Sequence, residues 1–82
     1  MILVDIYVPS VDKTYDFQLS EESEIDTVIE EIAEMIGQKE RTRIVGPKEK
    51  LLLCNQITME ILDKHKTLKE YGITTGQSLI FI

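Results

Sequence analysis

The 82-residue sequence predicts a single α+β domain, residues 1–82, in which one main helix covers one face of a mixed sheet. Three features support this fold. Apolar and polar residues alternate through residues 2–20, an apolar stripe at helical spacing follows, and an apolar strand closes the sequence after a tight turn. Such a strand needs neighbours on both edges, so we expect it at the centre of the sheet.

The first element predicted is a strand at residues 2–8, because every second residue from Ile2 to Val8 is apolar and β-branched. Turn-forming residues then lead into residues 14–20, which alternate in the same way. Together the two strands predict a hairpin with one buried face and one exposed face.

A helix should follow the hairpin. Ser23 is predicted to be its N-cap, because Asp26 follows three residues later in the pattern of a capping box. The apolar stripe indicates that one side of the helix packs on the sheet. Gly37 is predicted to end the helix, because glycine takes positive φ without steric cost. The stripe consists of Ile25, Val28, Ile29, Ile32 and Ile36.

The segment after the helix predicts the remaining strands. Residues 38–49 form a polar connection, and three consecutive leucines within residues 50–56 predict a strand. Residues 58–62 are a candidate short edge strand. The sheet is therefore expected to contain four to five strands.

The last part of the chain combines a turn with the final strand. Thr67 favours a short helical turn that Gly72 ends. The strand at residues 78–82 should then lie parallel to the first strand and beside it, with the helix as part of the crossover.

The composition limits the classes of function. The net charge of −6 and the pI near 4.6 disfavour binding to nucleic acid or an anionic membrane through general electrostatics. The single cysteine, Cys54, excludes an internal disulfide framework and a four-cysteine metal site. No apolar run approaches the ~20 residues of a membrane span. We therefore expect a cytoplasmic protein without cofactors and without direct membrane insertion.

One segment departs from the overall negative charge. Between residues 39 and 50 five basic side chains outnumber two acidic ones, which predicts either a loop that docks an acidic partner or an ordinary solvated loop. The basic residues are Lys39, Arg41, Arg43, Lys48 and Lys50.

The sequence from Thr67 to Ile73, with Gly76 and the final strand, resembles the turn and last strand of ubiquitin-like proteins. The isoleucine-rich helix and the phrase GITTGQSL make it more similar to the YukD-like or EsaB-like proteins encoded with bacterial type VII secretion systems. The resemblance implies the ubiquitin-like β-grasp fold and an accessory or regulatory role in such a system. It also implies a protein partner, such as a cytosolic domain of a membrane secretion component.

Residues suited to catalysis are few. His65 lies in a predicted polar turn and Cys54 at a strand end, so we expect a protein that is not an enzyme. Ubiquitin and the sulfur carriers of this fold act through a terminal glycine pair, whereas this sequence ends with Phe81 and Ile82. The resemblance therefore predicts a non-conjugating protein. The alternative is a truncated or degenerate modifier or sulfur carrier that lacks its diglycine tail.

Alternation along the last strand predicts two faces with different roles. Leu79 and Phe81 should face the helix, whereas Ile80 and Ile82 should lie on the uncovered sheet face. Apolar side chains on that face predict a protein-binding surface on a monomer, or the contact of a weak homodimer. The alternative is that residues 38–49 partly cover ordinary exposed apolar residues. The predicted surface consists of Leu3 and Tyr7, placed beside the last strand, together with Leu52, Ile80 and Ile82.

Overall fold

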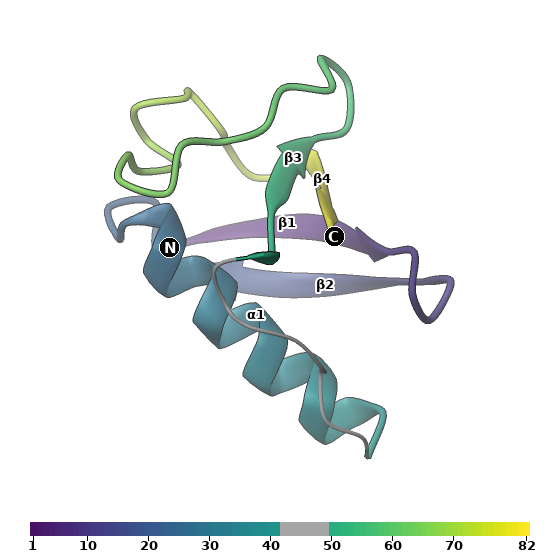
Figure 1. Ribbon diagram of the computed structural model, residues 1–82. Helices are drawn as coiled ribbons and strands as arrows, with labels where there is room; N and C mark the ends of the chain where they lie inside the picture. Colours follow the sequence, from purple (N-terminus) through teal and green to yellow (C-terminus); the bar gives the residue numbers. More distant parts are fainter. Residues whose placement is uncertain (42–49) are drawn as a thin grey trace.

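The computed structural model describes residues 1–41 and 50–82, which form one helix and a four-stranded mixed sheet (Figure 1). The helix lies across one face of the sheet, so the predicted α+β architecture is confirmed. In chain order the elements are β1 (Ile2–Val8), β2 (Lys13–Leu19), α1 (Ile25–Lys39), β3 (Leu53–Asn55) and β4 (Ser78–Phe81).

The strand order is β2-β1-β4-β3, and it places the last strand inside the sheet. β1 and β2 form an antiparallel hairpin. β4 runs parallel to β1, with Leu79 opposite Ile6, and antiparallel to β3, with Phe81 opposite Leu53. The prediction that the last strand has a neighbour on each edge is therefore confirmed.

The core lies between α1 and the sheet. All five residues of the predicted helical stripe are buried, because the stripe faces the sheet throughout its length. The buried residues alternate along β1, β2 and β4, as expected for a sheet with one covered face. The strand residues of the core are Val4, Ile6, Val8, Phe17, Leu19, Leu53, Leu79 and Phe81, and Leu62, Leu68 and Ile73 of the loops complete the cluster.

The N-terminal end of α1 differs from the prediction. Its N-cap residue is Glu24, which makes no side-chain cap, so the predicted cap at Ser23 is wrong. A distant turn supplies hydrogen-bond acceptors instead. The Ile25 N–H donates to the carbonyl of Lys66 at 2.8 Å, and the next N–H donates to that of Lys64 at 3.0 Å. These bonds satisfy two N–H groups that a helix leaves open at its start.

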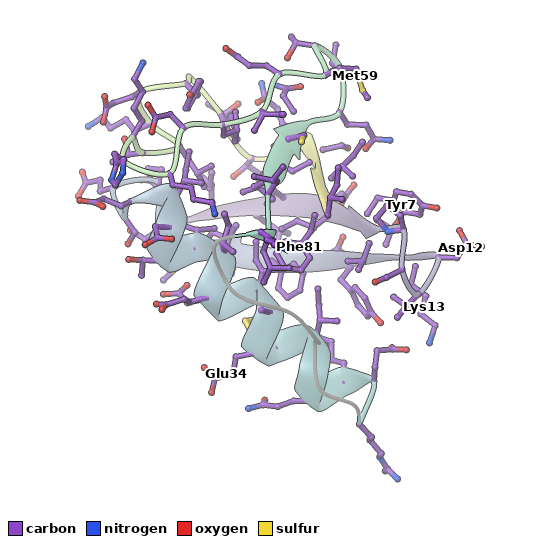
Figure 2. The ribbon with its side chains drawn as sticks, in the orientation of Figure 1. Tyr7, Asp12, Lys13, Glu34, Met59 and Phe81 are labelled. Carbon is purple, nitrogen blue, oxygen red and sulfur yellow. The ribbon has the colours of Figure 1, made fainter. Side chains whose placement is uncertain are left out.

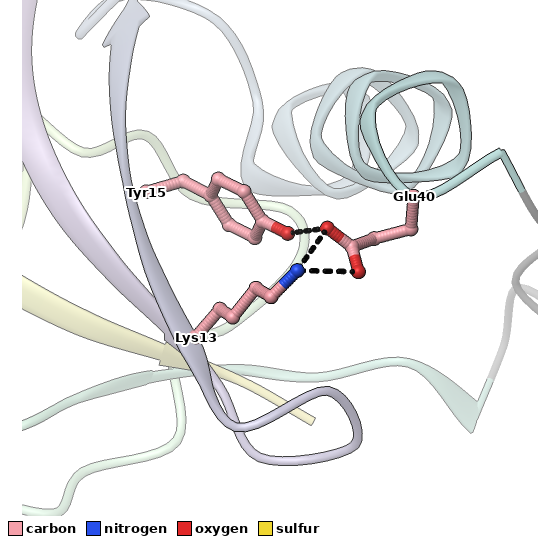
Figure 3. Close-up of polar contacts among 3 residues, drawn as sticks. All are labelled: Lys13, Tyr15 and Glu40. Carbon is pink, nitrogen blue, oxygen red and sulfur yellow. Dashed lines mark hydrogen bonds and ion pairs between the residues drawn. The ribbon is translucent and has the colours of Figure 1, made fainter.

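The C-terminal end of α1 lies beyond Gly37, so the predicted stop at that glycine is also wrong. Arg41, with a φ of 53°, takes the left-handed conformation instead. Two side chains of β2 hold the last turn, as Figure 3 shows. The Glu40 carboxylate pairs with the Lys13 amine at 3.1 Å and accepts a hydrogen bond from the Tyr15 hydroxyl. This tertiary contact extends the helix past its local stop signal.

β3 is shorter than the predicted strand at residues 50–56. The ladder with the last strand nevertheless continues one residue beyond it. Leu52 and Ile82 exchange two backbone hydrogen bonds, at 2.8 and 2.9 Å. Leu52 and Ile82 therefore form an antiparallel pair next to β3 and β4.

The predicted edge strand at residues 58–62 does not form. Within the described residues this segment pairs with the sheet only through one isolated bridge, between Ile61 and Cys54. Met59 has a φ of 61°, which breaks the extended conformation that a strand requires.

The predicted cap at Thr67 is present. The Glu70 N–H donates to Thr67 Oγ1 at 3.1 Å, and the Thr67 N–H donates to Glu70 Oε1 at 3.2 Å, which is a reciprocal capping box. The segment it opens is a hydrogen-bonded turn, closed at Gly72 with a φ of 70°. Gly76, with a φ of 94°, then reverses the chain into β4 and donates its N–H to the Leu3 carbonyl at 2.9 Å.

Candidate functional site

The two faces of β4 differ as predicted. Leu79 and Phe81 are buried against the helix side, and Phe81 points into the layer between sheet and helix in Figure 2. Ile80 is half-buried and Ile82 is 58% exposed on the opposite face. We call this side, which lies opposite α1, the open face. The expectation that residues 38–49 partly cover it falls mainly outside the described residues.

The strand register assembles an apolar row across the open face. Tyr7 of β1 lies opposite Ile80 of β4, and Ile80 lies opposite Cys54 of β3. Directly opposite residues of neighbouring strands project to the same face of a sheet. The Leu52 and Ile82 pair lies two residues along β3 and β4, so it borders this row.

The row continues beyond β3 into the loop that follows it. Cys54 and Ile61 form an antiparallel bridge. The flanking residues make its hydrogen bonds: the Asn55 N–H donates to the Glu60 carbonyl, and the Leu62 N–H donates to the Leu53 carbonyl, both at 2.9 Å. In such a pair the two side chains are especially close and share a face. Cys54 is accordingly only 4% exposed, while Ile61 remains 58% exposed.

These residues are neighbours in the strand register on the open face, and we call them the open-face patch, in which Cys54 is itself buried. It contains four of the five residues predicted for the binding surface and two that were not predicted. Its members are Tyr7, Leu52, Cys54, Ile61, Ile80 and Ile82.

Leu3 is the exception among the predicted residues. It is 49% exposed and projects to the open face, but it lies four residues before Tyr7 on the same strand. A polar row separates it from Ile80, because Asp5 lies opposite Ser78 between them. The expectation that Leu3 lies beside the last-strand isoleucines is therefore wrong.

Sequence reasoning missed the apolar loop after β3. Ile57, Met59 and Ile61 are 81%, 67% and 58% exposed, and Met59 lies at the outer end of the loop in Figure 2. Their spacing of two is visible in the sequence, but for residues 58–62 it predicts a short edge strand rather than an exposed loop. Asn55 holds the loop through its Oδ1 atom, which accepts the N–H of Ile57 at 2.9 Å.

Acidic groups border the open-face patch on the β1 and β2 side. The Tyr7 hydroxyl donates to Asp12 Oδ1 at 2.8 Å, and this hydrogen bond raises the pKa of Tyr7 above its ordinary value of 10.0. Asp5 lies opposite Asp16, and a hydrogen bond and the charge of Asp16 raise the pKa of Asp5 above 3.8. The surroundings of the patch are thus negative.

The predicted basic loop is only partly described. Lys39 and Arg41 lie at the C-terminal end of α1, and Lys50 precedes β3. Lys39 Nζ lies 5.8 Å from the centroid of the Tyr15 ring, a cation–π distance. Arg43 and Lys48 lie outside the described residues, so docking through this loop stays a prediction.

The remaining reactive side chains offer little for catalysis. Burial raises the pKa of the Cys54 thiol, which disfavours the nucleophilic thiolate. His65 is exposed in a turn, where its backbone N–H donates to Asp63 Oδ1 at 2.9 Å. In the part of the chain that the structure describes, no three His, Cys, Asp or Glu side chains are placed to hold a metal ion. Within residues 1–41 and 50–82, no helix is long and apolar enough to cross a bilayer.

Solved structures share this fold at low sequence identity. The N-terminal ubiquitin-like domain in the 4931431F19Rik protein is 20% identical with a TM-score of 0.76, covering 99% of this chain and 72% of that one. The UBL domain of Plasmodium falciparum Dsk2 is 18% identical with a TM-score of 0.74, covering 98% and 93%. The ubiquitin-like domain of Arabidopsis thaliana At2g32350 is 20% identical with a TM-score of 0.71, covering 99% and 74%. The fold is therefore the ubiquitin-like β-grasp.

Comparison with protein families is more specific. No curated protein matches the chain. Residues 2–81 match the family described as "WXG100 protein secretion system (Wss), protein YukD", so the match spans nearly the whole fold. The chain therefore belongs to the YukD family of ubiquitin-like proteins of the WXG100 secretion system.

Proposed function

We propose that the chain is a non-catalytic interaction module of the WXG100 secretion system, which binds a protein partner through the open-face patch. The observation that supports this most strongly is the contiguity of the patch, which crosses β1, β4, β3 and the following loop. Apolar side chains gathered on an uncovered face mark an interaction surface, whereas scattered ones need no explanation. The partner we expect is a cytosolic domain of a membrane component of the system, which would place this chain in the cytoplasm.

The exposure of the patch supports this role. Ile82, two residues after Ile80, and Ile61, which bridges Cys54, are each 58% exposed, while Ile80 is half-buried. A partner that covers the exposed parts of Ile61, Ile80 and Ile82 would remove apolar surface from water, which favours binding.

The test is Ile80→Asp, measured by secretion of a WXG100 protein and by binding to the purified cytosolic domains of the secretion components. We expect affinity to fall at least about tenfold, because a carboxylate enclosed by an apolar interface loses its hydration. Circular dichroism should remain unchanged, because Ile80 projects away from the core. Thr27→Asp is the control, since it adds the same charge at an exposed position of α1, away from the open face.

A second variant separates loss of binding from loss of folding. Phe81→Ala removes a buried ring and should lower the free energy of unfolding by about 3–5 kcal/mol. If Ile80→Asp destabilised the protein as much as Phe81→Ala, Ile80 would belong to the core. If Ile80→Asp left both binding and secretion intact, the open-face patch would not be the interaction surface.

A further inference from the structure

Two carboxylates lie directly opposite each other on the open face. Asp5 of β1 is the cross-strand partner of Asp16 of β2, and both are exposed. Asp5 lies two residues before Tyr7 on the same strand, so the pair forms the row next to the apolar row. Two residues along a strand correspond to about 6–7 Å, which places the acidic pair beside the open-face patch.

Among residues 1–41 and 50–82, no base is paired with Asp5 or Asp16 in the strand register. Like charges directly opposite each other destabilise a sheet. The residues that flank the pair on this face, Thr14 and Gln18 on β2 and Ser78 on β4, are uncharged. Lys13, the nearest base on β2, pairs with Glu40 on the helix side at 3.1 Å. The described strand neighbours on this face therefore do not offset the cost of the Asp5 and Asp16 pair.

We propose that the open-face patch recognises a protein segment that carries an apolar side chain next to an arginine, with the guanidinium lying across Asp5 and Asp16. This inference rests on the proposed function and adds the chemistry of the partner. Directly opposite side chains have Cβ atoms about 4.5–5.5 Å apart, a separation that a planar, multiply donating guanidinium can bridge. Hydrogen bonds of this kind are charge-assisted and roughly twice as strong as neutral ones.

Other occupants fit this surface less well. The net charge of −6 and the acidic pair repel phosphate groups, which disfavours a nucleic acid or an anionic membrane. A metal ion would need more ligands than two carboxylates, and the described residues gather no third one there. An apolar segment with a neighbouring arginine complements both the apolar row and the acidic row.

The experiment uses the full chain in cells that carry the WXG100 secretion system. A photo-cross-linking residue, Thr14→p-benzoylphenylalanine, reports contacts at this place because position 14 lies opposite Tyr7 and two residues before Asp16. Mass spectrometry then maps the cross-linked partner segment, which should contain an arginine beside an apolar residue. The double variant Asp5→Asn with Asp16→Asn should lower the cross-link yield about 5–10-fold through loss of the charge-assisted bonds.

The same double variant should melt at an equal or higher temperature, because it removes the repulsion between the two carboxylates. A merely structural role for the pair would instead lower yield and stability together. The control is Glu31→Gln with Glu34→Gln, which removes the same charge from the exposed side of α1. Asp16→Arg should abolish the cross-link, and changing the mapped partner arginine to aspartate should restore it.

The outcomes separate the two proposals. A cross-link that responds equally to the Asp5 and Asp16 changes and to the helix control overturns this inference and leaves the proposed function standing. A mapped segment without a basic residue also overturns this inference alone. The same holds if no cross-link forms while Ile80→Asp still impairs binding. If no cross-link forms and Ile80→Asp is also harmless, the interaction role of the open face is itself wrong.

Discussion

Glu40 joins the end of α1 to β2 through a carboxylate shared by two partners. Both of its oxygens lie 3.1 Å from Lys13 Nζ, and one also accepts the hydrogen bond of the Tyr15 hydroxyl (Figure 3). The hydrogen bond from Tyr15, followed by that from Lys13, lowers the pKa of Glu40 below 4.5, and the same contact raises the pKa of Tyr15 to about 12. A phenol that donates to a carboxylate resists deprotonation, so Tyr15 reports directly on this contact.

Replacing Glu40→Gln should lower the pKa of Tyr15 from about 12 towards 10.0, because an uncharged amide no longer favours the protonated phenol. Ultraviolet absorbance of the phenolate during an alkaline titration measures the change. Tyr15→Phe identifies which of the titration steps belongs to this residue. An unchanged titration curve in Glu40→Gln would show that the contact does not persist in solution.

At the scale of single residues, the alternation along a strand predicted which face a residue occupies, but not which residues of the neighbouring strand lie beside it. The alternation along β4 correctly assigned Leu79 and Phe81 to the core and Ile80 to the open face. The position of Leu3 relative to Ile80 depends on the register between β1 and β4. The alternation within either strand does not determine that register. Ile61 joins the patch through its bridge to Cys54, after a residue with positive φ, so local pattern could not place it.

At the scale of elements, the interior of the helix was predictable and its ends were not. The five-residue stripe follows from the 3.6-residue period, and each of its members is buried. Ser23 carried the local cap signal, but the carbonyls of Lys64 and Lys66 bind the first N–H groups of α1 instead. These acceptors come from the other half of the chain, so the tertiary structure overrides the local signal.

The turn that supplies the carbonyl of Lys66 is followed at once by the capping box of Thr67 and Glu70. Thr67→Ala removes the hydroxyl that accepts the Glu70 N–H, and it should lower the free energy of unfolding by about 0.5–2 kcal/mol. Urea denaturation measures the loss. Thr74→Ala, an exposed position in the next turn, should stay within about 0.5 kcal/mol of the parent. Equal effects at the two positions would contradict the role of the cap.

At the scale of the whole molecule, two carboxyl groups contribute to folding stability with opposite dependence on pH. The folded-state pKa of Asp5 is raised above 3.8, so its stabilising contribution is full below that pH and is lost as pH rises through the raised value. The folded-state pKa of Glu40 is lowered below 4.5, so its contribution is present above that pH and is lost as pH falls through the lowered value. Replacing Asp5 with Asn and Glu40 with Gln should therefore change the free energy of unfolding in opposite directions near neutral pH.

Urea denaturation between about pH 3 and about pH 7 tests this expectation. Near neutral pH, Asp5→Asn should be more stable than the parent, because the parent then carries two opposed charges at the pair. Glu40→Gln should be less stable than the parent at the same pH, because the contacts with Lys13 and Tyr15 weaken. Both differences should shrink in acid. Differences that do not depend on pH would mean that neither carboxyl is coupled to folding.

The hydrogen bond from the Ile25 N–H to the Lys66 carbonyl also means that the start of α1 can reach its final structure only after the C-terminal half has been synthesised. A ribosome makes the hairpin and the helix first, yet the acceptor for the helix start and the strand β4 that pairs with β1 come from the last part of the chain. The nascent N-terminal half therefore lacks both this acceptor and the β3 and β4 part of the core until the C-terminal half is made. Long-range closure of this kind slows folding, because the entropy of the intervening loop must be lost before the contacts form.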